Sequence, residues 1–166
     1  MMIHIAGNLT DSNITPISEE QLSPNGLDVK LDKVFKINSN DLFVIDANNN
    51  KQHRNLEQVM PDEEGFFNLD EGVYSVIMEG EVALDMHTAG VILPRSTFMR
   101  NGIILETCLY DSGYHGVMVS SLVVRCGKAK IQRGTRIGQF VLWQAEALHK
   151  YEGSYGKTSE HDKKYS

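Results

Sequence analysis

Residues 24–37 read PNGLDVKLDKVFKI, a stretch in which apolar residues alternate with polar and charged ones. After the Pro-Asn-Gly turn signal, Leu27, Val29 and Leu31 occupy every second position, and the apolar-rich run VFKI follows the next charged pair. A period of two places alternate side chains on the same face of a β-strand, which is typical of a strand with one buried face. The stretch therefore predicts strand structure from Gly26 onward.

The rest of the chain continues in short apolar runs separated by turn signals such as Asp70-Glu71-Gly72 and Glu79-Gly80-Glu81, with almost no helical periodicity. Many short strands joined by glycine turns favour an antiparallel sandwich or barrel, so we expect an all-β fold with few short helices. The predicted strands are 42–45, 66–69, 73–78, 82–84, 91–93, 103–105, 117–124, 129–131 and 137–143.

Three segments depart from this pattern. Ser18 and Gln21 have the spacing of a capping box, which predicts one short helix before Pro24. Residues 46–64 are rich in Asn, Asp, Gln and Glu and predict a long surface excursion. Residues 151–166 have no apolar face, so we expect one domain at 1–150 followed by a flexible tail without a core of its own.

Composition excludes several classes of protein. The chain has 166 residues, 41% of them hydrophobic, and a net charge of -6 without a long basic stripe, so we expect a soluble domain that binds no polymeric nucleic acid. A small anionic ligand needs only a few local cations. No apolar run has the length of a membrane span, and we expect a cytoplasmic protein without a membrane partner. Cys108 and Cys126 lack metal-ligand spacing and predict buried thiols.

Residues 93–102, LPRSTFMRNG, combine the guanidinium groups of Arg95 and Arg100 with the hydroxyls of Ser96 and Thr97 at a predicted strand-to-helix turn. Forked guanidinium donors and short hydroxyls are suited to a polyphosphate. On these residues alone, a solvated surface turn is the more ordinary interpretation.

Residues 110–116, YDSGYHG, place Asp111 in a tight turn before an apolar strand. An ionised carboxylate in such a place can orient a water molecule and take up its proton. In most proteins, however, an Asp-Ser-Gly turn only bonds to its own backbone.

The order of these motifs resembles that of the trimeric dUTPase and dCTP deaminase superfamily over roughly residues 24–159. The stretches that carry the resemblance are PNGLDVKLDKVFKI (24–37), FNLDEGVY (67–74), LPRSTFMRNG (93–102), YDSGYHG (110–116), RGTRIGQFVL (133–142) and KYEGSYGKTS (150–159). The resemblance implies a distorted jelly-roll β-barrel, a homotrimer with shared active sites, and a magnesium-dependent enzyme acting on pyrimidine deoxynucleoside triphosphates.

The resemblance also assigns roles to individual residues. Asp111 matches the catalytic aspartate that orients the water attacking the α-phosphate. Tyr114 matches the aromatic residue against the deoxyribose, and Tyr155 matches the tail aromatic over the base. Asp28 matches an acid that supports the magnesium ion indirectly, through water. The phosphate-binding positions correspond to Arg95, Ser96, Thr97, Arg100 and Gln139.

Ser121 distinguishes between the two branches of the superfamily. The deaminases place a proton-shuttling glutamate five residues after the glycine that matches Gly116, and here that position is Ser121. A hydroxyl does not ionise near neutral pH, so deamination by that route is disfavoured. The preceding hairpin is shortened, with Glu106 and Thr107 at its tip. A carboxylate there would accept a hydrogen bond from a base amino or imino group, so the base remains open, and a solvated hairpin tip is the alternative.

These observations favour an enzyme that hydrolyses dUTP to dUMP and diphosphate. Two alternatives remain at this stage: a dCTP-directed deaminase or diphosphatase, and a catalytically weak module that binds a nucleotide or a protein partner.

Overall fold

The computed structural model describes residues 1–156 and residue 162, so most of the predicted tail, 157–161 and 163–166, lies outside the described residues. The prediction of an all-β fold is confirmed. In chain order the elements are β1 (Met2–Ile3), β2 (Asn13–Thr15), the 3-10 helix η1 (Glu19–Gln21), β3 (Leu22–Ser23), β4 (Gly26–Ile37), β5 (Val44–Ile45), β6 (Lys51–Gln52), β7 (Leu56–Val59), β8 (Phe66–Leu69), β9 (Gly72–Ala83), β10 (Thr88–Pro94), α1 (Ser96–Arg100), β11 (Ile103–Glu106), β12 (His115–Val124), β13 (Ala129–Gln132) and β14 (Arg136–Gln144).

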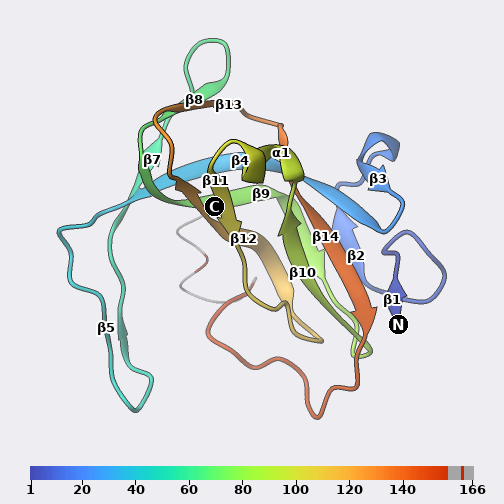
Figure 1. Ribbon diagram of the computed structural model, residues 1–166. Coiled ribbons are helices and arrows are strands. Elements are labelled where there is room, and N and C mark those ends of the chain that lie inside the picture. The colour runs from blue at the N-terminus through green and yellow to red at the C-terminus, as the bar shows by residue number, and fades with distance from the viewer. Residues whose placement is uncertain (157–161, 163–166) are drawn as a thin grey trace.

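Ten strands form one curled antiparallel sheet, with the main order β1-β14-β4-β9-β12-β11 (Figure 1). β4 causes the curl because it changes partners along its length. Residues 27–30 pair with β14, and residues 31–36 pair with β9, with irregular register at the change between Leu31 and Lys33. One long strand therefore joins the two halves of the sheet.

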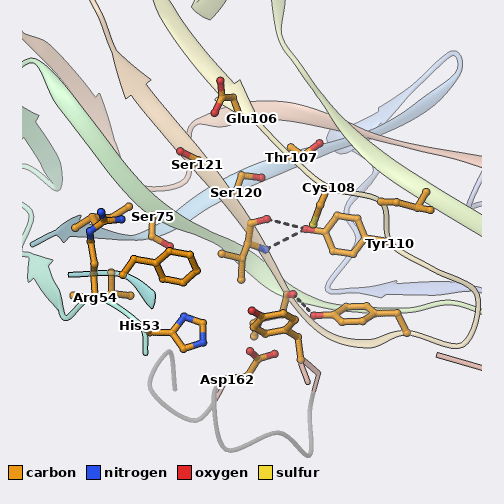
Figure 2. Close-up of a pocket in the computed structure, with 18 of the residues that line it drawn as sticks. His53, Arg54, Ser75, Glu106, Thr107, Cys108, Tyr110, Ser120, Ser121 and Asp162 are labelled. Atoms are coloured by element: carbon orange, nitrogen blue, oxygen red, sulfur yellow. Dashed lines mark hydrogen bonds between the residues drawn. The ribbon is translucent and has the colours of Figure 1, made fainter. Parts of the chain in front are cut away.

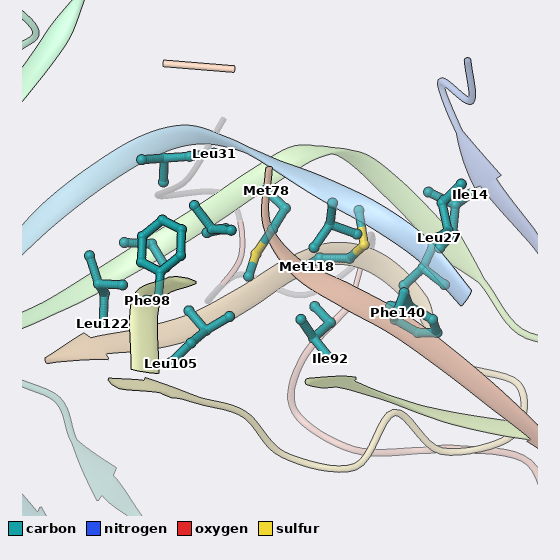
Figure 3. Packing of buried hydrophobic residues seen from close by; sticks show 14 of the residues in the cluster. Ile14, Leu27, Leu31, Met78, Ile92, Phe98, Leu105, Met118, Leu122 and Phe140 are labelled. Carbon is teal, nitrogen blue, oxygen red and sulfur yellow. The ribbon is translucent and has the colours of Figure 1, made fainter. Parts of the chain in front are cut away.

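The concave side of the sheet encloses the hydrophobic core. Leu27 and Leu31 of β4 pack in one cluster with Met78 of β9, Met118 of β12 and Phe140 of β14 (Figure 3). All five are at most 1% exposed. Burial of each such side chain contributes about 1.5–3 kcal/mol relative to exposure, so the predicted alternation of β4 has a direct energetic cause.

The short helix predicted near Ser18 is present as η1. The Ser18 backbone N–H and Oγ both donate to Gln21 Oε1, at 3.1 and 2.9 Å. The Gln21 side chain then donates to the backbone oxygen of Asp28 at 2.9 Å. The capping pair thus connects this turn to the beginning of β4.

The predicted break at Glu79-Gly80-Glu81 is wrong, because β9 continues through it. Gly80 has φ +84°, and a Cβ there would lie 1.9 Å from the backbone oxygen of Thr15. This glycine is required by the close approach of β2, not by a turn.

Two other sequence predictions need correction. Cys108 and Cys126 are free but exposed; Cys108 follows the end of β11, and Cys126 lies beyond the end of β12, so neither belongs to the core-facing part of a strand. Residues 46–64 are not merely a surface excursion. They contain β6 and β7, and β7 pairs with β4. The described residues include no helix long and apolar enough to cross a membrane.

Candidate active site

A cavity of about 540 Å³ lies against β9, β11 and β12 (Figure 2). Its walls come from three further segments: the loop after β11, the arm formed by residues 38–55, and the end of the described chain. Four predicted site residues line this one cavity, namely Glu106, Thr107, Tyr114 and Tyr155. We call it the aromatic pocket, because Tyr110 and Tyr151 line it as well.

One wall of the aromatic pocket is a row of polar side chains across three strands. Glu106 of β11 is the register partner of Ser121 in β12, and Ser121 is the register partner of Ser75 in β9. Directly paired residues point to the same face of a sheet and lie about 5 Å apart. The alternate positions, Val76, Leu105 and Leu122, belong to the hydrophobic core, so the polar row lies on the opposite face of the sheet, where it lines the pocket and is suited to a polar ligand.

Tyrosines form the opposite end of the pocket. The Tyr114 ring meets Tyr110 edge-on at 5.5 Å between centroids and Tyr151 at 5.4 Å. The Tyr114 hydroxyl donates to the backbone oxygen of Val117 at 2.9 Å, and Tyr110 Oη bonds both the nitrogen and oxygen of Val119 at 3.1 Å. Burial raises the pKa of both phenols, so they remain protonated donors.

The turn that carries Asp111 is rigidly held from behind. Ser112 Oγ donates to the backbone oxygen of Thr88 at 2.8 Å, and the Gly113 N–H donates to the backbone oxygen of Asp85 at 3.1 Å. Gly113 has φ +79°, which favours glycine. The loop is therefore fixed by its backbone and by Ser112, which leaves the Asp111 side chain exposed.

The Asp111 carboxylate makes no hydrogen bond with any described residue, so the common bond from such a side chain to its own turn is not formed. Burial raises the pKa of Tyr151, and the negative charge of Asp111 contributes to the same shift. Tyr110, the residue before Asp111, lines the aromatic pocket, and the Tyr151 N–H donates to the backbone oxygen of Ser112, the residue after it, at 3.1 Å, so Asp111 lies close to the pocket rim.

Two of the phosphate-binding candidates, Arg95 and Thr97, line a second, cationic cavity of about 440 Å³. Lys30, Arg95 and Arg136 line it together with a single acid, Glu20. Arg95 Nη1 lies 3.0 Å from Asp28 Oδ2, and Arg136 Nη1 lies 3.3 Å from the same oxygen. Lys30 pairs with Glu20, so the three cations face two acids, Glu20 and Asp28, and the remaining positive charge suits an anionic ligand.

Asp28 is the buried anchor of this cavity. It is 4% exposed, and its second oxygen, Oδ1, has no hydrogen-bond partner among the described residues. Gln139 is the register partner of Asp28, and its Nε2 donates to Ser23 Oγ at 3.0 Å. Asp28 thus positions two guanidinium groups and keeps one acceptor unused.

The remaining phosphate candidates are on α1, directly after β10, as the predicted strand-to-helix turn requires. Ser96 and Thr97 begin the helix with exposed side chains, and Arg100 ends it, also exposed. Thr97 lines the cationic cavity; Ser96 and Arg100 line neither cavity.

Within one chain, the structure therefore separates the predicted residues into two groups. The aromatic pocket and the cationic cavity share no lining residue. In the part of the chain that the structure describes, no cluster of three or more acids, histidines or cysteines could by itself hold a metal ion.

Sequence reasoning missed several residues at these sites. The arm contributes Phe43, His53 and Arg54 to the aromatic pocket, although Phe43 falls in the predicted strand 42–45 and the other two fall in the predicted surface excursion 46–64. No local pattern could have identified them, because long-range packing brings them to the pocket. Arg136 carried a signal, since it lies three residues before Gln139 within the same motif.

The sequence is similar to known proteins over most of its length. Residues 4–145 match the model of the dCTP deaminase-like family. A probable deoxyuridine 5'-triphosphate nucleotidohydrolase from Methanopyrus kandleri is 33% identical over 144 residues, covering 85% of this chain and 91% of that protein. The deoxyuridine 5'-triphosphate nucleotidohydrolase of Methanocaldococcus jannaschii is 29% identical over 154 residues, covering 91% and 97%.

Solved structures support the fold. The 2'-deoxycytidine 5'-triphosphate deaminase of Agrobacterium tumefaciens aligns with a TM-score of 0.60 at 19% identity, over 83% of this chain. This chain spans 45% of that deaminase chain. A dUTPase of Staphylococcus bacteriophage 80alpha aligns with a TM-score of 0.50 at 13% identity, over 88% of this chain and 98% of the dUTPase. With its family match and its relatives above 30% identity, the chain belongs to the dCTP deaminase-like family of the dUTPase and dCTP deaminase superfamily.

Proposed function

We propose that this protein is a dUTP diphosphatase, which hydrolyses dUTP to dUMP and diphosphate. The observation that carries the proposal is the 33% identity, over 85% of the chain, to a relative named as a dUTP nucleotidohydrolase. Ser121 in the polar row supports it, because a hydroxyl cannot shuttle the proton that deamination of cytosine needs.

Asp111 is the proposed catalytic residue. Its carboxylate is exposed at the pocket rim on a turn whose backbone is fixed by Ser112 and Gly113, so it can accept a hydrogen bond from a water molecule beside a bound nucleotide. The carboxylate accepts a proton of that water, and the water oxygen attacks the α-phosphorus. The bond from that phosphorus to the bridging oxygen breaks, and diphosphate leaves. Tyr114 is proposed to pack against the deoxyribose and Tyr155 against the base.

The cationic cavity is the proposed triphosphate site. Arg95, with Thr97 at the cavity wall, would meet phosphate oxygens, and developing negative charge there is stabilised by fixed donors. Arg136, which sequence reasoning missed, would act with Arg95. Ser96, Arg100 and Gln139 remain proposed contacts to the phosphate chain.

A divalent cation, proposed to be magnesium, fits the donors of this cavity provided that water and the substrate phosphates supply most of its ligands. Magnesium keeps several waters and binds mainly through substrate phosphates, so no cluster of protein ligands is needed. The unpartnered, buried Asp28 Oδ1 could accept a hydrogen bond from one of those waters. When bound, the ion would neutralise charge on the phosphates.

The separation of the two cavities supports assembly of the site from several chains. The catalytic carboxylate must lie beside the α-phosphate, yet Asp111 belongs to the rim of the aromatic pocket and Arg95 to the cationic cavity. We propose a homotrimer in which the aromatic pocket of one chain faces the cationic cavity of the next. Light scattering should give three times the mass of the chain, and a fully active monomer would refute the shared site.

The test of the activity follows both products. Purified protein is incubated with magnesium and each of the deoxynucleoside triphosphates, and diphosphate and ammonia are measured separately. We expect diphosphate from dUTP and no ammonia from dCTP. Ammonia from dCTP at a rate comparable with diphosphate from dUTP would support the deaminase alternative instead. Binding without any turnover would support the catalytically weak module.

Asp111→Asn tests the catalytic role, because the amide keeps the shape but is a much weaker proton acceptor. We expect kcat to fall by about 100-fold or more with the binding of dUTP retained. Asp70→Asn is the matched control. It makes the same change on an exposed acid that pairs with Lys128 and lines neither cavity. Equal activity of the two variants would remove Asp111 from the mechanism.

A further inference from the structure

The arm, residues 38–55, is an ordered wall of the aromatic pocket. Its ends are joined by a hydrogen bond from the Asn38 N–H to the Asn55 backbone oxygen at 3.0 Å. Asp41 braces it, since its carboxylate accepts from the Asn55 N–H at 2.8 Å and its backbone oxygen accepts from Arg54 Nε at 3.0 Å. The base of the arm is therefore fixed where Arg54 enters the pocket.

Within the arm, Arg54 is held in place but keeps donors free. Its guanidinium carbon lies 5.9 Å from the centroid of the Phe43 ring, and Phe43 in turn lies 6.1 Å from the His53 ring. Nε is the only Arg54 donor with a hydrogen-bond acceptor among the described residues. The two terminal nitrogens of Arg54 are available to a ligand.

Uncommitted polar groups face the same space. Ser75 and Ser121 line the pocket with Arg54, and neither serine hydroxyl bonds any described residue. Figure 2 shows Arg54 and Ser75 at one end of the pocket and Tyr110 at the other. Polar groups without hydrogen-bond partners on a pocket wall indicate a site for a polar ligand.

We propose that Arg54 is a specificity-determining residue that selects uracil over cytosine by donating to the carbonyl oxygen at C4. This inference rests on the proposed function, which places the sugar and phosphates at the rim marked by Tyr114 and Asp111. In a pyrimidine nucleotide C4 lies across the ring from the nitrogen that carries the sugar. The group at C4 therefore faces the end of the pocket lined by Arg54, Ser75 and Ser121.

The chemistry of that end distinguishes the two bases. Uracil has an acceptor at C4, whereas cytosine has an amino donor there. A guanidinium has donors only, so it bonds the uracil oxygen and opposes the cytosine amino group. Serine hydroxyls donate or accept and adapt to either base. Glu106, the register partner of Ser121, offers acceptors only, so Arg54 is the group at this end that favours the uracil oxygen.

The experiment measures selectivity instead of activity alone. The ratio of kcat/KM for diphosphate release from dUTP to that from dCTP is determined for the wild type, Arg54→Gln and Arg54→Lys. Glutamine can present an acceptor to an amino group, so we expect its ratio to fall by about 10-fold to 100-fold. Lysine retains donors and should keep most of the preference. Arg125→Gln is the control, because Arg125 is exposed and lines neither cavity.

Binding of dUpNHpp and dCpNHpp, measured by calorimetry on the same proteins, supplies a readout independent of hydrolysis. A wild type that releases no diphosphate from dUTP would refute the proposed function, but the binding ratio would still test Arg54. An equal loss for both nucleotides in Arg54→Gln would assign Arg54 only to holding the arm and overturn the proposal. An unchanged ratio would overturn it too.

Discussion

Replacing Ser120 by alanine should raise the stability of the free protein. Ser120 is 5% exposed in β12, and its hydroxyl has no hydrogen-bond partner among the described residues. Burying an unpaired hydroxyl costs about 1–3 kcal/mol. Alanine removes that cost and loses only the packing of one small atom, which is worth less than about 1 kcal/mol. We expect a net gain of about 1 kcal/mol.

Ser112→Ala is the matched comparison. Ser112 has almost the same exposure, 6%, but its hydroxyl donates to the backbone oxygen of Thr88 at 2.8 Å. Loss of this bond leaves a buried acceptor without its donor and should destabilise by about 1–3 kcal/mol. The same chemical change therefore has opposite signs at the two positions.

Thermal unfolding followed by circular dichroism measures the stability of both variants. For a chain of this length, 1 kcal/mol corresponds to about 2–4 °C in Tm, so Ser120→Ala should melt higher and Ser112→Ala lower than the wild type. A lower Tm of free Ser120→Ala would refute the reasoning.

Three further predictions concern stability and closure. Gly80→Ala should destabilise by more than about 2 kcal/mol in chemical denaturation, because its Cβ would lie 1.9 Å from Thr15 O at φ +84°; a wild-type midpoint would contradict this. Burial raises the pKa of Asp85, but hydrogen bonds led by that from Thr10 outweigh burial and lower it to about 2. The resulting stability, about 1 kcal/mol after allowance for solvent screening, is present above the unfolded pKa of about 4 and is lost as the pH falls through about 2. The free energy of unfolding of Asp85→Asn should therefore lie below that of the wild type near neutral pH and approach it only at low pH. A difference in this free energy that does not change with pH would exclude the mechanism. Truncation after Lys150 removes Tyr151 and Tyr155 from the aromatic pocket, so kcat/KM for dUTP should fall at least 10-fold with the fold retained; unchanged kcat/KM would rule out a contribution of the tail.

Local sequence patterns correctly predicted the structural features that depend only on neighbouring residues. The alternation in β4, the capping pair at Ser18 and Gln21, and the turn at Asp111 are all present, because each follows from backbone geometry over a few residues. The pattern was wrong at Gly80, where the cause of the glycine is a distant strand. The sequence shows the glycine, but it does not show that the backbone oxygen of Thr15 approaches it.

The candidate site shows the same limit. The motifs located Arg95 and Asp28, and the structure joins them in an ion pair at 3.0 Å. The arm was missed, because Arg54 and His53 have the composition of a solvated loop and become pocket residues only when Asp41 fixes the arm. Long-range contacts between polar segments leave no periodic signal.

Asp111 can be exposed and still fit its proposed catalytic role, because hydrogen bonds from neighbouring residues fix the backbone of the turn that carries it. The Asp85 backbone oxygen accepts from the Gly113 N–H, and the Asp85 carboxylate accepts from Thr10 Oγ1 at 2.7 Å and from the His87 N–H at 2.7 Å. The turn is thus connected to the N-terminal segment and to the start of β10 by hydrogen bonds, most of them to backbone atoms. Such a frame fixes the backbone from which the exposed carboxylate reaches the solvent. The fold therefore fixes the backbone of the turn without a hydrogen bond from the Asp111 side chain to any described residue.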